Sequence, residues 1–454
     1  MSQRLILMLK FPTPGAVKTR LAPALGPPRA CELHRALVRQ TLTEVERFAN
    51  HARVAVEVRL AGAPDAAAGR AWLGEPVTIR EQGEGDLGER MDRAARCAFA
   101  EGATAVVVIG GDCPQLTAEH LAGAFAALAQ NDAVLGPAAD GGYYLIGQRR
   151  PISALFQGIR WGSTEVLAQT LAVARVHSIA VAQLGVLHDV DLPEDLPYWA
   201  KTPAARAAGR SGLSIIIPAL NEEAQLGATL LAARRDQPHE IIVADGGSTD
   251  RTIEVARAHD VIVLKAPAGR ARQMNAAAEV ATGGVLLFLH ADTLLPANYS
   301  ELIRATLSRP GVVGGAFQFA LGGAFAGRRL IERGTNWRAR VRQMPYGDQG
   351  LFLRRETFDQ LNGFPDQAIM EDYEFVRRLQ RLGRIALADG AATTSGRRWQ
   401  RLGPWRTTLI NSLMVLGYRA GVAPATLAKW YRRPGRSSAG SVAIPGNKVP
   451  ASVI

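Results

Sequence analysis

The sequence predicts an α/β protein built from two tandem domains, each with a mostly parallel sheet flanked by helices. The chain has 454 residues, too many for one ordinary core at about 100 to 200 residues per domain. Short β-branched or apolar runs alternate with stretches of helical period, which is typical of parallel strands covered by helices. The alternation stops in a basic, small-residue stretch at residues 201–212 and then restarts. Two units joined by a linker are therefore expected.

In the first domain, expected at residues 1–200, apolar runs predict strands and longer periodic stretches predict helices. The strands are expected at residues 5–9, 54–58, 77–80, 105–109, 133–135 and 179–181. The helices are expected at residues 29–48, 87–100, 118–130 and 164–174.

The second domain is expected at residues 213–436, after the linker at residues 201–212. Residues 437–454 contain Ser, Gly and Pro and are expected to form a disordered tail. Strands are expected at residues 213–217, 241–244, 261–264 and 285–289, and helices at residues 223–235, 249–259 and 272–281.

The formal charge of +12 is concentrated in the second half. Residues 1–210 hold 22 Lys and Arg against 21 Asp and Glu, whereas residues 211–454 hold 31 against 20. Such a surplus attracts nucleic acid, anionic lipid or phosphorylated small molecules. Because aromatic residues make up only 6% of the chain and no nucleic-acid-binding motif is present, we expect no nucleic-acid partner.

The three cysteines form no CxxC pair, which argues against a disulfide framework or a zinc site. We find no secretory signal and no convincing apolar span of about 20 residues. A cytoplasmic protein is therefore expected.

Polar side chains follow three predicted strands of the second half, at the point where each strand ends. In open α/β sheets, ligands bind beyond the carboxyl ends of the strands. Glycines there permit close approach of the backbone to a ligand. The residues are Pro218, Asn221 and Glu222 after the first strand, Asp245 and Gly246 after the second, and His290 and Asp292 after the fourth.

With these motifs, residues 213–400 resemble the family-two, GT-A-type glycosyltransferases, inverting enzymes that use nucleotide-diphosphate sugars. The resemblance implies that residues 218–222 and Asp245 hold the nucleoside and that residues 269–275 lie along the nucleotide. It also implies that Asp292 binds a divalent cation, Mg or Mn. The chain departs from the family's Asp-X-Asp motif because His290 replaces the first Asp, and these two ions prefer oxygen ligands.

Inversion by direct displacement needs a carboxylate base near the acceptor hydroxyl. The segment IMEDYEF at residues 369–375 matches the family's acidic motif, so Asp372 is the predicted base and Glu371 the substitute. The departing diphosphate is anionic and is stabilised by fixed cations. Further contacts with the nucleotide sugar or the acceptor are expected at Arg270, Asn275, Arg398 and Trp399.

Beyond this motif, residues 405–433 place Leu409, Leu413 and Leu416 at helical spacing among aromatic and basic residues. Two interpretations are open. The amphipathic helix packs on its own domain, or it lies on the inner face of the membrane and presents a lipid-soluble acceptor. The acceptor is accordingly expected to be a small molecule or a lipid, with peripheral membrane contact in the second case.

In the first half, a Pro/Gly loop carrying Lys18 and Arg20 follows the first strand, and such loops can hold phosphates. With the motifs at residues 84–91, 106–116, 134–147 and 188–196, residues 4–200 resemble a glycosyltransferase-related family that is similar to the guanylyltransferases of cofactor synthesis. The resemblance implies phosphate contacts at Lys18 and Arg20, a substrate pocket shaped by Asp140 and Gly141, and a divalent cation shared by Asp112 and Asp191.

Genes for these two families are neighbours or fusions associated with arsenosugar biosynthesis, so the resemblance implies a bifunctional glycosyl-transfer protein. The second domain would transfer a sugar from a nucleotide diphosphate, and the first would make an activated intermediate or perform a related transfer. One alternative is that nucleotidyl transfer by the first domain is the main chemistry and the second domain only binds. Another is a non-catalytic, basic membrane adaptor.

Overall fold

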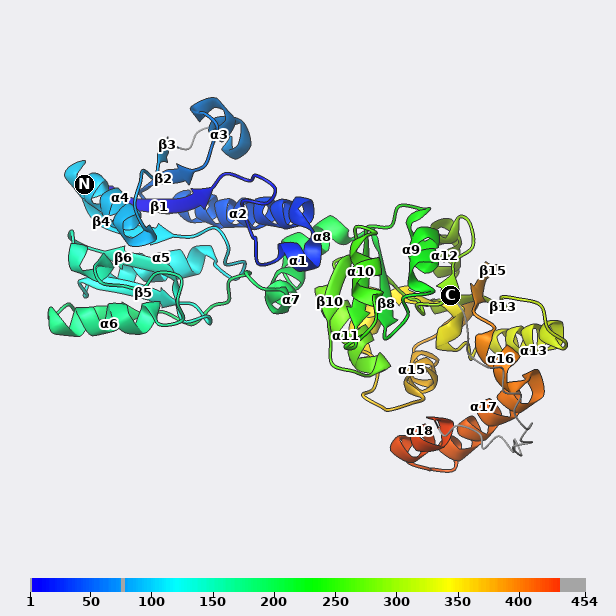
Figure 1. The fold of residues 1–454 in the computed structure, drawn as a ribbon. Helices are drawn as coiled ribbons and strands as arrows, with labels where there is room; N and C mark the ends of the chain where they lie inside the picture. The colour runs from blue at the N-terminus through cyan, green and yellow to red at the C-terminus, as the bar shows by residue number, and fades with distance from the viewer. Residues whose placement is uncertain (1, 75–77, 433–454) are drawn as a thin grey trace, which may run out of the picture.

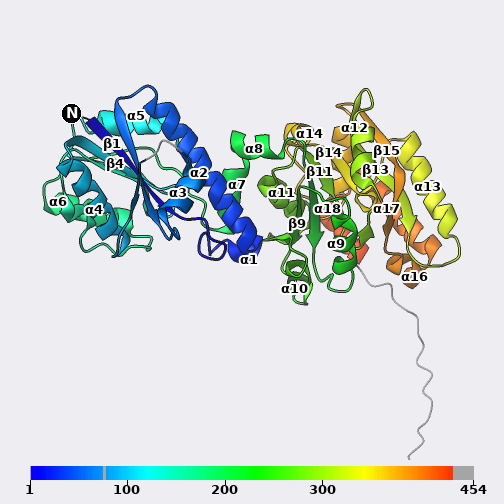
Figure 2. The same cartoon turned by 90° about the horizontal axis from the view of Figure 1, so that it is seen from above.

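The chain forms two α/β halves that lie side by side (Figure 1). The computed structural model describes residues 2–74 and 78–432. The predicted tail at residues 437–454 and the last four residues of the predicted second domain lie outside the described residues. Each half has a sheet of mostly parallel strands with helices on its faces, as Figure 2 shows from above. The predicted fold class is confirmed.

The first half contains a 7-stranded sheet in the order β3-β2-β1-β4-β6-β5-β7. Strand β6 is antiparallel to its neighbours, and the other pairs are parallel. The strands are β1 (Ser2–Lys10), β2 (Val54–Ala61), β3 (Thr78–Glu81), β4 (Ala103–Ile109), β5 (Ala133–Pro137), β6 (Tyr143–Gln148) and β7 (Val181–Gln183). The helices are α1 (Ala22–Leu25), α2 (Pro27–Ala49), α3 (Ala66–Leu73), α4 (Leu87–Ala100), α5 (Ala118–Ala127), α6 (Val166–Val176), α7 (Leu196–Ala200) and α8 (Pro203–Gly209), with short 3-10 turns at Ser153–Phe156 and Pro193–Asp195.

The second half contains an 8-stranded sheet in the order β10-β9-β8-β11-β14-β13-β15-β12. The strands are β8 (Leu213–Ala219), β9 (Glu240–Asp245), β10 (Ile262–Lys265), β11 (Val285–Phe288), β12 (Thr293–Leu294), β13 (Val312–Leu321), β14 (Leu351–Arg354) and β15 (Arg384–Thr394). The helices are α9 (Leu226–Arg234), α10 (Thr252–Arg257), α11 (Arg270–Val280), α12 (Tyr299–Leu307), α13 (Arg328–Val341), α14 (Arg355–Gln360), α15 (Glu371–Leu379), α16 (Arg397–Leu402), α17 (Pro404–Arg419) and α18 (Pro424–Arg432), with a 3-10 turn at Gly347–Gln349.

Apart from the two-residue strand β12, the second sheet repeats the topology of the first. In both, the third, second, first and fourth strands are parallel neighbours, and an antiparallel strand (β6 or β14) follows. The acids Asp112 and Asp292 come shortly after the equivalent strands β4 and β11. The two halves are therefore variants of one architecture, with equivalent strand ends.

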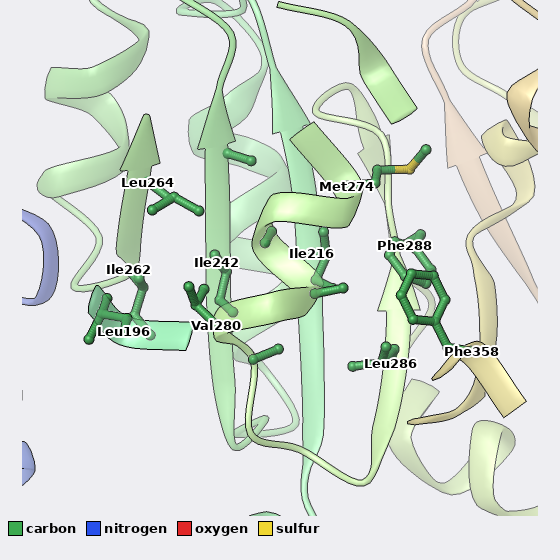
Figure 3. Close-up of a cluster of buried hydrophobic side chains, with 14 of the residues drawn as sticks. Leu196, Ile216, Ile242, Ile262, Leu264, Met274, Val280, Leu286, Phe288 and Phe358 are labelled. Atoms are coloured by element: carbon green, nitrogen blue, oxygen red, sulfur yellow. The ribbon is translucent and has the colours of Figure 1, made fainter. Parts of the chain in front are cut away.

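A large apolar cluster fixes the strands that carry the candidate site. Figure 3 shows Met274 of α11 near Phe288 of the second sheet, with Ile216 and Ile242 in the same cluster. Leu196 of α7, from the other side of the junction, packs into the same cluster. Burying large apolar side chains stabilises by about 1.5–3 kcal/mol each, so the strand ends have rigid support.

The expected linker and C-terminal helix differ in detail from the structure. The stretch at residues 201–212 contains the short helix α8, whose first turn is capped by the Thr202 hydroxyl. The helical stretch predicted at residues 405–433 is divided into α17 and α18. The break lies at Gly421, which has a φ of 86°, just before Pro424, which cannot donate a helical hydrogen bond.

Candidate functional site

Two cavities meet at the carboxyl ends of β8 and β11. The larger has a volume of about 870 Å³ and the smaller about 380 Å³. Both are lined by Arg270, His290, Asp292, Ile369, Glu371 and Tyr431. The larger cavity adds Pro218, Glu222, Arg272 and Gln273, and the smaller adds Tyr346, Asp348, Asp372, Trp399 and residues of α17.

The acid at the end of β11 is paired with an arginine. Arg397 Nη2 lies 3.3 Å from Asp292 Oδ2 and 3.1 Å from Glu222 Oε2. The Asp292 side chain is 24% exposed and that of Arg397 is 52% exposed. One guanidinium therefore links two predicted donor-site acids and is accessible enough to exchange partners.

The turn before α15 directs two acids toward the cavities. Met370, with a φ of 69°, adopts the left-handed conformation immediately before the helix, a conformation uncommon outside glycine. Glu371 follows, is buried, and lies 3.3 Å from Arg270 Nη1. Burial and the neighbouring Asp372 raise the pKa of Glu371, whereas Arg270 opposes the increase.

Asp372 lies beside the backbone of Gly347 and close to His290. Its Oδ2 accepts a hydrogen bond from the Gly347 amide at 2.8 Å. A Cβ atom at position 347 would lie 2.9 Å from His290 Nε2 and 3.3 Å from Asp372 Oδ2. A side chain at position 347 would therefore displace the imidazole or the carboxylate, which face the same point of the backbone.

His290 and Asp292, which follow β11, fit a divalent cation that takes its other ligands from phosphate and water. Burial, followed by the charge of Arg270, lowers the pKa of His290 well below its usual value, so its imidazole is neutral. Asp292 adds carboxylate oxygens. Mg²⁺ sites commonly combine one or two protein carboxylates with phosphates and waters. Among the described residues no group of three or more His, Cys, Asp or Glu side chains is arranged to hold a metal, so the remaining ligands would have to come from phosphate and water.

Four of the predicted nucleotide-sugar residues are engaged in local structure. The Asp245 carboxylate accepts hydrogen bonds from the amides of Gly247 and Ser248, and Asn221 Oδ1 accepts one from Thr249. Asn275 exchanges two hydrogen bonds with the backbone of Phe364. A Cβ atom at position 246, which Gly246 lacks, would lie 3.0 Å from the Gln273 side chain. These residues shape the loops, and none of the four lines either cavity.

Of the predicted Arg398–Trp399 pair, the Arg398 side chain lies outside the described part of the chain. Trp399 lines the smaller cavity, and its buried indole Nε1 has no hydrogen-bond partner among the described residues. Asp348 lines the same cavity and was not predicted from the sequence. Its buried Oδ1 atom also has no partner among those residues. Each residue therefore brings to the wall of this cavity a buried polar atom that has no partner in the described part of the chain.

We expect Asp348→Asn to reduce the dependence of stability on pH. Burial raises the pKa of Asp348 to about 6 from 3.8, partly opposed by Arg338 and reinforced by Asp372. The folded state therefore holds this proton more tightly than the unfolded state, and stability falls as pH rises from about 4 to about 6. The variant should be less sensitive in this window by about 1–2 kcal/mol. Denaturant unfolding at several pH values measures it, and an unchanged slope would contradict the burial of this carboxyl group.

In the first half, the predicted residues Lys18, Asp112 and Asp191 come together. The Lys18 ammonium, on a side chain only 5% exposed, lies 2.7 Å from Asp191 Oδ1 and 3.3 Å from Asp112 Oδ2. The two carboxylates outweigh burial, which alone would lower the pKa of Lys18, and the net shift is upward. The ammonium lies between the two acids, at the position that a shared divalent cation would take, and the predicted cation there stays a prediction.

The other predicted residues of the first half lie around this cluster or on the surface. Asp140 Oδ1 accepts a hydrogen bond from the Gly142 amide at 2.8 Å. Gly141 has a φ of 92°, and a Cβ atom there would lie 2.0 Å from the Thr164 carbonyl. Arg20 is exposed. Burial and the carboxylates of Asp112, Asp140 and Asp191 raise the pKa of Asp189, which was not predicted, to about 7.

The fold and the strand-end site define the second half as an open α/β sheet whose ligand-binding edge lies at the carboxyl ends of its strands. Residues 214–361 match the family model "Glycosyl transferase family 2", so this half contains a glycosyltransferase family 2 domain. Residues 44–163 match "Uncharacterized protein conserved in bacteria (DUF2064)". The chain therefore joins a domain of each family, which agrees with the predicted fusion.

Similar proteins include several glycosyltransferases. The glycosyltransferase AglE of Haloferax volcanii is 26% identical over 35% of this chain and 57% of its own length. A PGL/p-HBAD biosynthesis glycosyltransferase of Mycobacterium bovis is 38% identical over 18% of this chain and 36% of its own length. The chain thus spans less than two thirds of either relative.

Among solved structures, a Desulfovibrio desulfuricans protein assigned provisionally as a nucleotide-diphospho-sugar transferase is 36% identical, with a TM-score of 0.42, over 44% of this chain and 87% of its own. A mannosyltransferase of Pyrobaculum calidifontis, solved with GDP-Man and Mn²⁺, is 23% identical, with a TM-score of 0.33, over 44% of this chain and 62% of its own.

Proposed function

We propose that the second half transfers a sugar from a nucleotide-diphosphate donor to an acceptor hydroxyl by inverting displacement. The observation that carries this proposal is the pair of cavities that share Arg270, His290, Asp292 and Glu371. The larger cavity has room for the nucleotide diphosphate. The smaller one is lined by Asp372, whose carboxylate is hydrogen-bonded only to backbone amides among the described residues. The sugar would lie at the wall that the two cavities share, because the donor and the acceptor must meet there.

On the donor side, Arg270 and Arg272 supply positive charge to the diphosphate, and Pro218 and Glu222 border the nucleoside. Asp292 and His290 would hold the divalent cation, whose contribution when bound is to neutralise the charge that develops on the leaving diphosphate. Arg397 would release Asp292 and turn to a phosphate oxygen, because its guanidinium lies beside Glu222, which lines the larger cavity, and guanidinium groups bind phosphate well.

On the acceptor side, Asp372 would take the proton of the attacking hydroxyl. The acceptor oxygen forms a bond to the anomeric carbon while the bond from that carbon to the diphosphate oxygen breaks on the opposite face, which inverts the configuration. The nucleoside diphosphate leaves with the electron pair. Glu371 is less suited to this role because its carboxylate is paired with Arg270.

The proposal is tested by incubating the purified full-length chain with UDP-glucose, UDP-N-acetylglucosamine, GDP-mannose and dTDP-glucose. Release of nucleoside diphosphate is measured with Mn²⁺, with Mg²⁺ and with chelator. We expect cation-dependent hydrolysis of at least one donor, because water can replace the acceptor. If the protein neither binds nor hydrolyses any of these donors, the proposal is contradicted.

For the first half, we propose a separate activity on a phosphorylated substrate, so that the protein is bifunctional. The observation that favours it is the buried Lys18 ammonium beside Asp112, which follows β4, and Asp191, because lysine is a common phosphate ligand. We expect pyrophosphate release from a panel of nucleoside triphosphates, abolished in Lys18→Met. Release that persists in this variant would contradict the assignment. A place in arsenosugar biosynthesis stays a prediction from the resemblance.

A further inference from the structure

Helices α13, α17 and α18 carry an unusual share of exposed apolar side chains. In Figure 1, α13 lies at the side of the second half that faces away from the first half, and α17 and α18 lie below the second sheet. Half of the exposed large apolar side chains among the described residues lie on these three helices. We call the set on α13 and α17 the basic–aromatic face. It consists of Leu330, Trp337, Val341, Trp405, Leu409, Leu413 and Leu416, together with the exposed Arg329 and Arg333 beside them.

On α17, the exposed side chains form one continuous strip. Trp405, Leu409, Leu413 and Leu416 are spaced by three or four residues, and each is at least 50% exposed. The opposite face of the helix is packed, because Met414 is buried in a cluster with Met370, Tyr373 and Leu427. A helix that is anchored on one side and apolar on its solvent side has a free binding surface.

Helix α13, which contacts α17, repeats this pattern. Leu330, Trp337 and Val341 are between 57% and 59% exposed and follow one another at helical spacing. The exposed residues Arg329 and Arg333 lie on the adjoining strip of the helix. Tryptophan beside arginine on an amphipathic surface is typical of the interface between water and lipid.

The charge of the two segments indicates the sign of the partner. Residues 328–342 contain six arginines against one glutamate, and residues 397–432 contain six arginines and one lysine with no acidic residue. The single glutamate, Glu332, lies 3.4 Å from Arg328. A second copy of the chain would bring like charges together, whereas an anionic surface is complementary.

We propose that the basic–aromatic face binds the surface of an anionic lipid bilayer. No helix in the described part of the chain is long and apolar enough to cross a membrane, so the contact is interfacial. Asn411, Met414 and Val415 of α17 line the smaller cavity, while the other side of the same helix carries the apolar strip. The bilayer would therefore lie about one helix diameter, roughly 10 Å, from that cavity. If the proposed function holds, this position suits a lipid-borne acceptor.

The test is flotation of the full-length protein with vesicles of phosphatidylcholine alone and of phosphatidylcholine with phosphatidylglycerol. We expect flotation with the anionic vesicles, weakened by salt because exposed charges are screened. Replacing Trp405, Leu409, Leu413 and Leu416 together by serine should lower the vesicle affinity at least tenfold. The matched control is Leu231→Ser, which changes a leucine that is 62% exposed on α9. Binding is measured without any sugar donor, so this result is independent of the proposed function.

A wild-type protein that stays unbound with anionic vesicles, or a fourfold serine variant that floats as well as the wild type, would overturn the proposal. So would a wild-type dimer that the serine variant converts to monomer, because the face would then join two copies. Tight binding of an RNA oligonucleotide that displaces the vesicles would also overturn it. Circular dichroism of the variant checks that the fold is retained, and Arg329→Gln with Arg333→Gln gives a second, milder loss that does not depend on the serine substitutions.

Discussion

Asp372→Asn is expected to lower the rate of sugar transfer by about 10²–10⁴-fold, the usual contribution of a general base. An asparagine side chain has the same shape and keeps an oxygen that can accept the hydrogen bond from the Gly347 amide. It cannot take a proton from the acceptor hydroxyl. We therefore expect the loss in kcat, with little change in the affinity for the nucleotide-sugar donor. Nucleoside diphosphate release under donor saturation measures the rate, and calorimetric titration with the donor measures affinity.

The matched control for this variant is Asp389→Asn. Asp389 belongs to the same half, is 79% exposed and, among the described residues, pairs only with Arg309 at the surface, so the rate should be unchanged. Glu371→Gln separates the two neighbouring acids. It removes a charge that holds Arg270 and should weaken donor binding more than Asp372→Asn does. Wild-type rates in Asp372→Asn would contradict the role of this carboxylate as the base.

Asp292→Asn is expected to reduce both cation-dependent donor binding and transfer, with a loss of about 10²-fold or more in rate. The amide is a weaker ligand for a hard divalent cation than the carboxylate. The substitution also removes the charge that holds Arg397, since Asp292 Oδ2 lies 3.3 Å from the guanidinium. Titration of the variant with UDP and with GDP, in the presence and absence of Mn²⁺, measures the change. Donor affinity that depends on Mn²⁺ as strongly as in the wild type would contradict this assignment.

Arg397→Gln provides the complementary experiment. Because it frees Asp292 and Glu222 of a competing cation, it should raise the affinity of the unliganded protein for Mn²⁺. Transfer should nevertheless fall, since the same guanidinium is proposed to move to the leaving phosphate. A variant with unchanged cation affinity would show that the ion pair does not compete with the metal.

The fold class and the strand-end acids could be predicted because both follow local rules. Buried parallel strands are recognisable in the sequence as short apolar runs, and Asp292 and Asp112 follow such runs closely. The antiparallel strands β6 and β14 were not anticipated. The segments around Gly142 and Gly350 have the composition of loops. Each nevertheless leads into a strand whose partner is distant in sequence.

Asp348 was not predicted because strand β14 was not predicted. It lies in the turn before that strand, and only the pairing of β14 with β11 brings the turn to the end of β11. The pairing of Lys18 with Asp112 and Asp191 was hidden for a similar reason. The three residues were each predicted, but a sequence separation of up to 173 residues gives no indication that the ammonium lies between the carboxylates. Side-chain partners of this kind depend on tertiary packing.

The central claim is that the cleft of the second half, between the ends of β8 and β11, is the donor site. It is tested most directly by crystal structures of the full-length protein with Mn²⁺ and either UDP or GDP. We predict a nucleoside diphosphate in the larger cavity, with its phosphates at Arg270, a Mn²⁺ ion bound by Asp292, and Arg397 turned away from that carboxylate. A nucleotide bound only in the first half beside Lys18, with the second cleft empty, would contradict the claim.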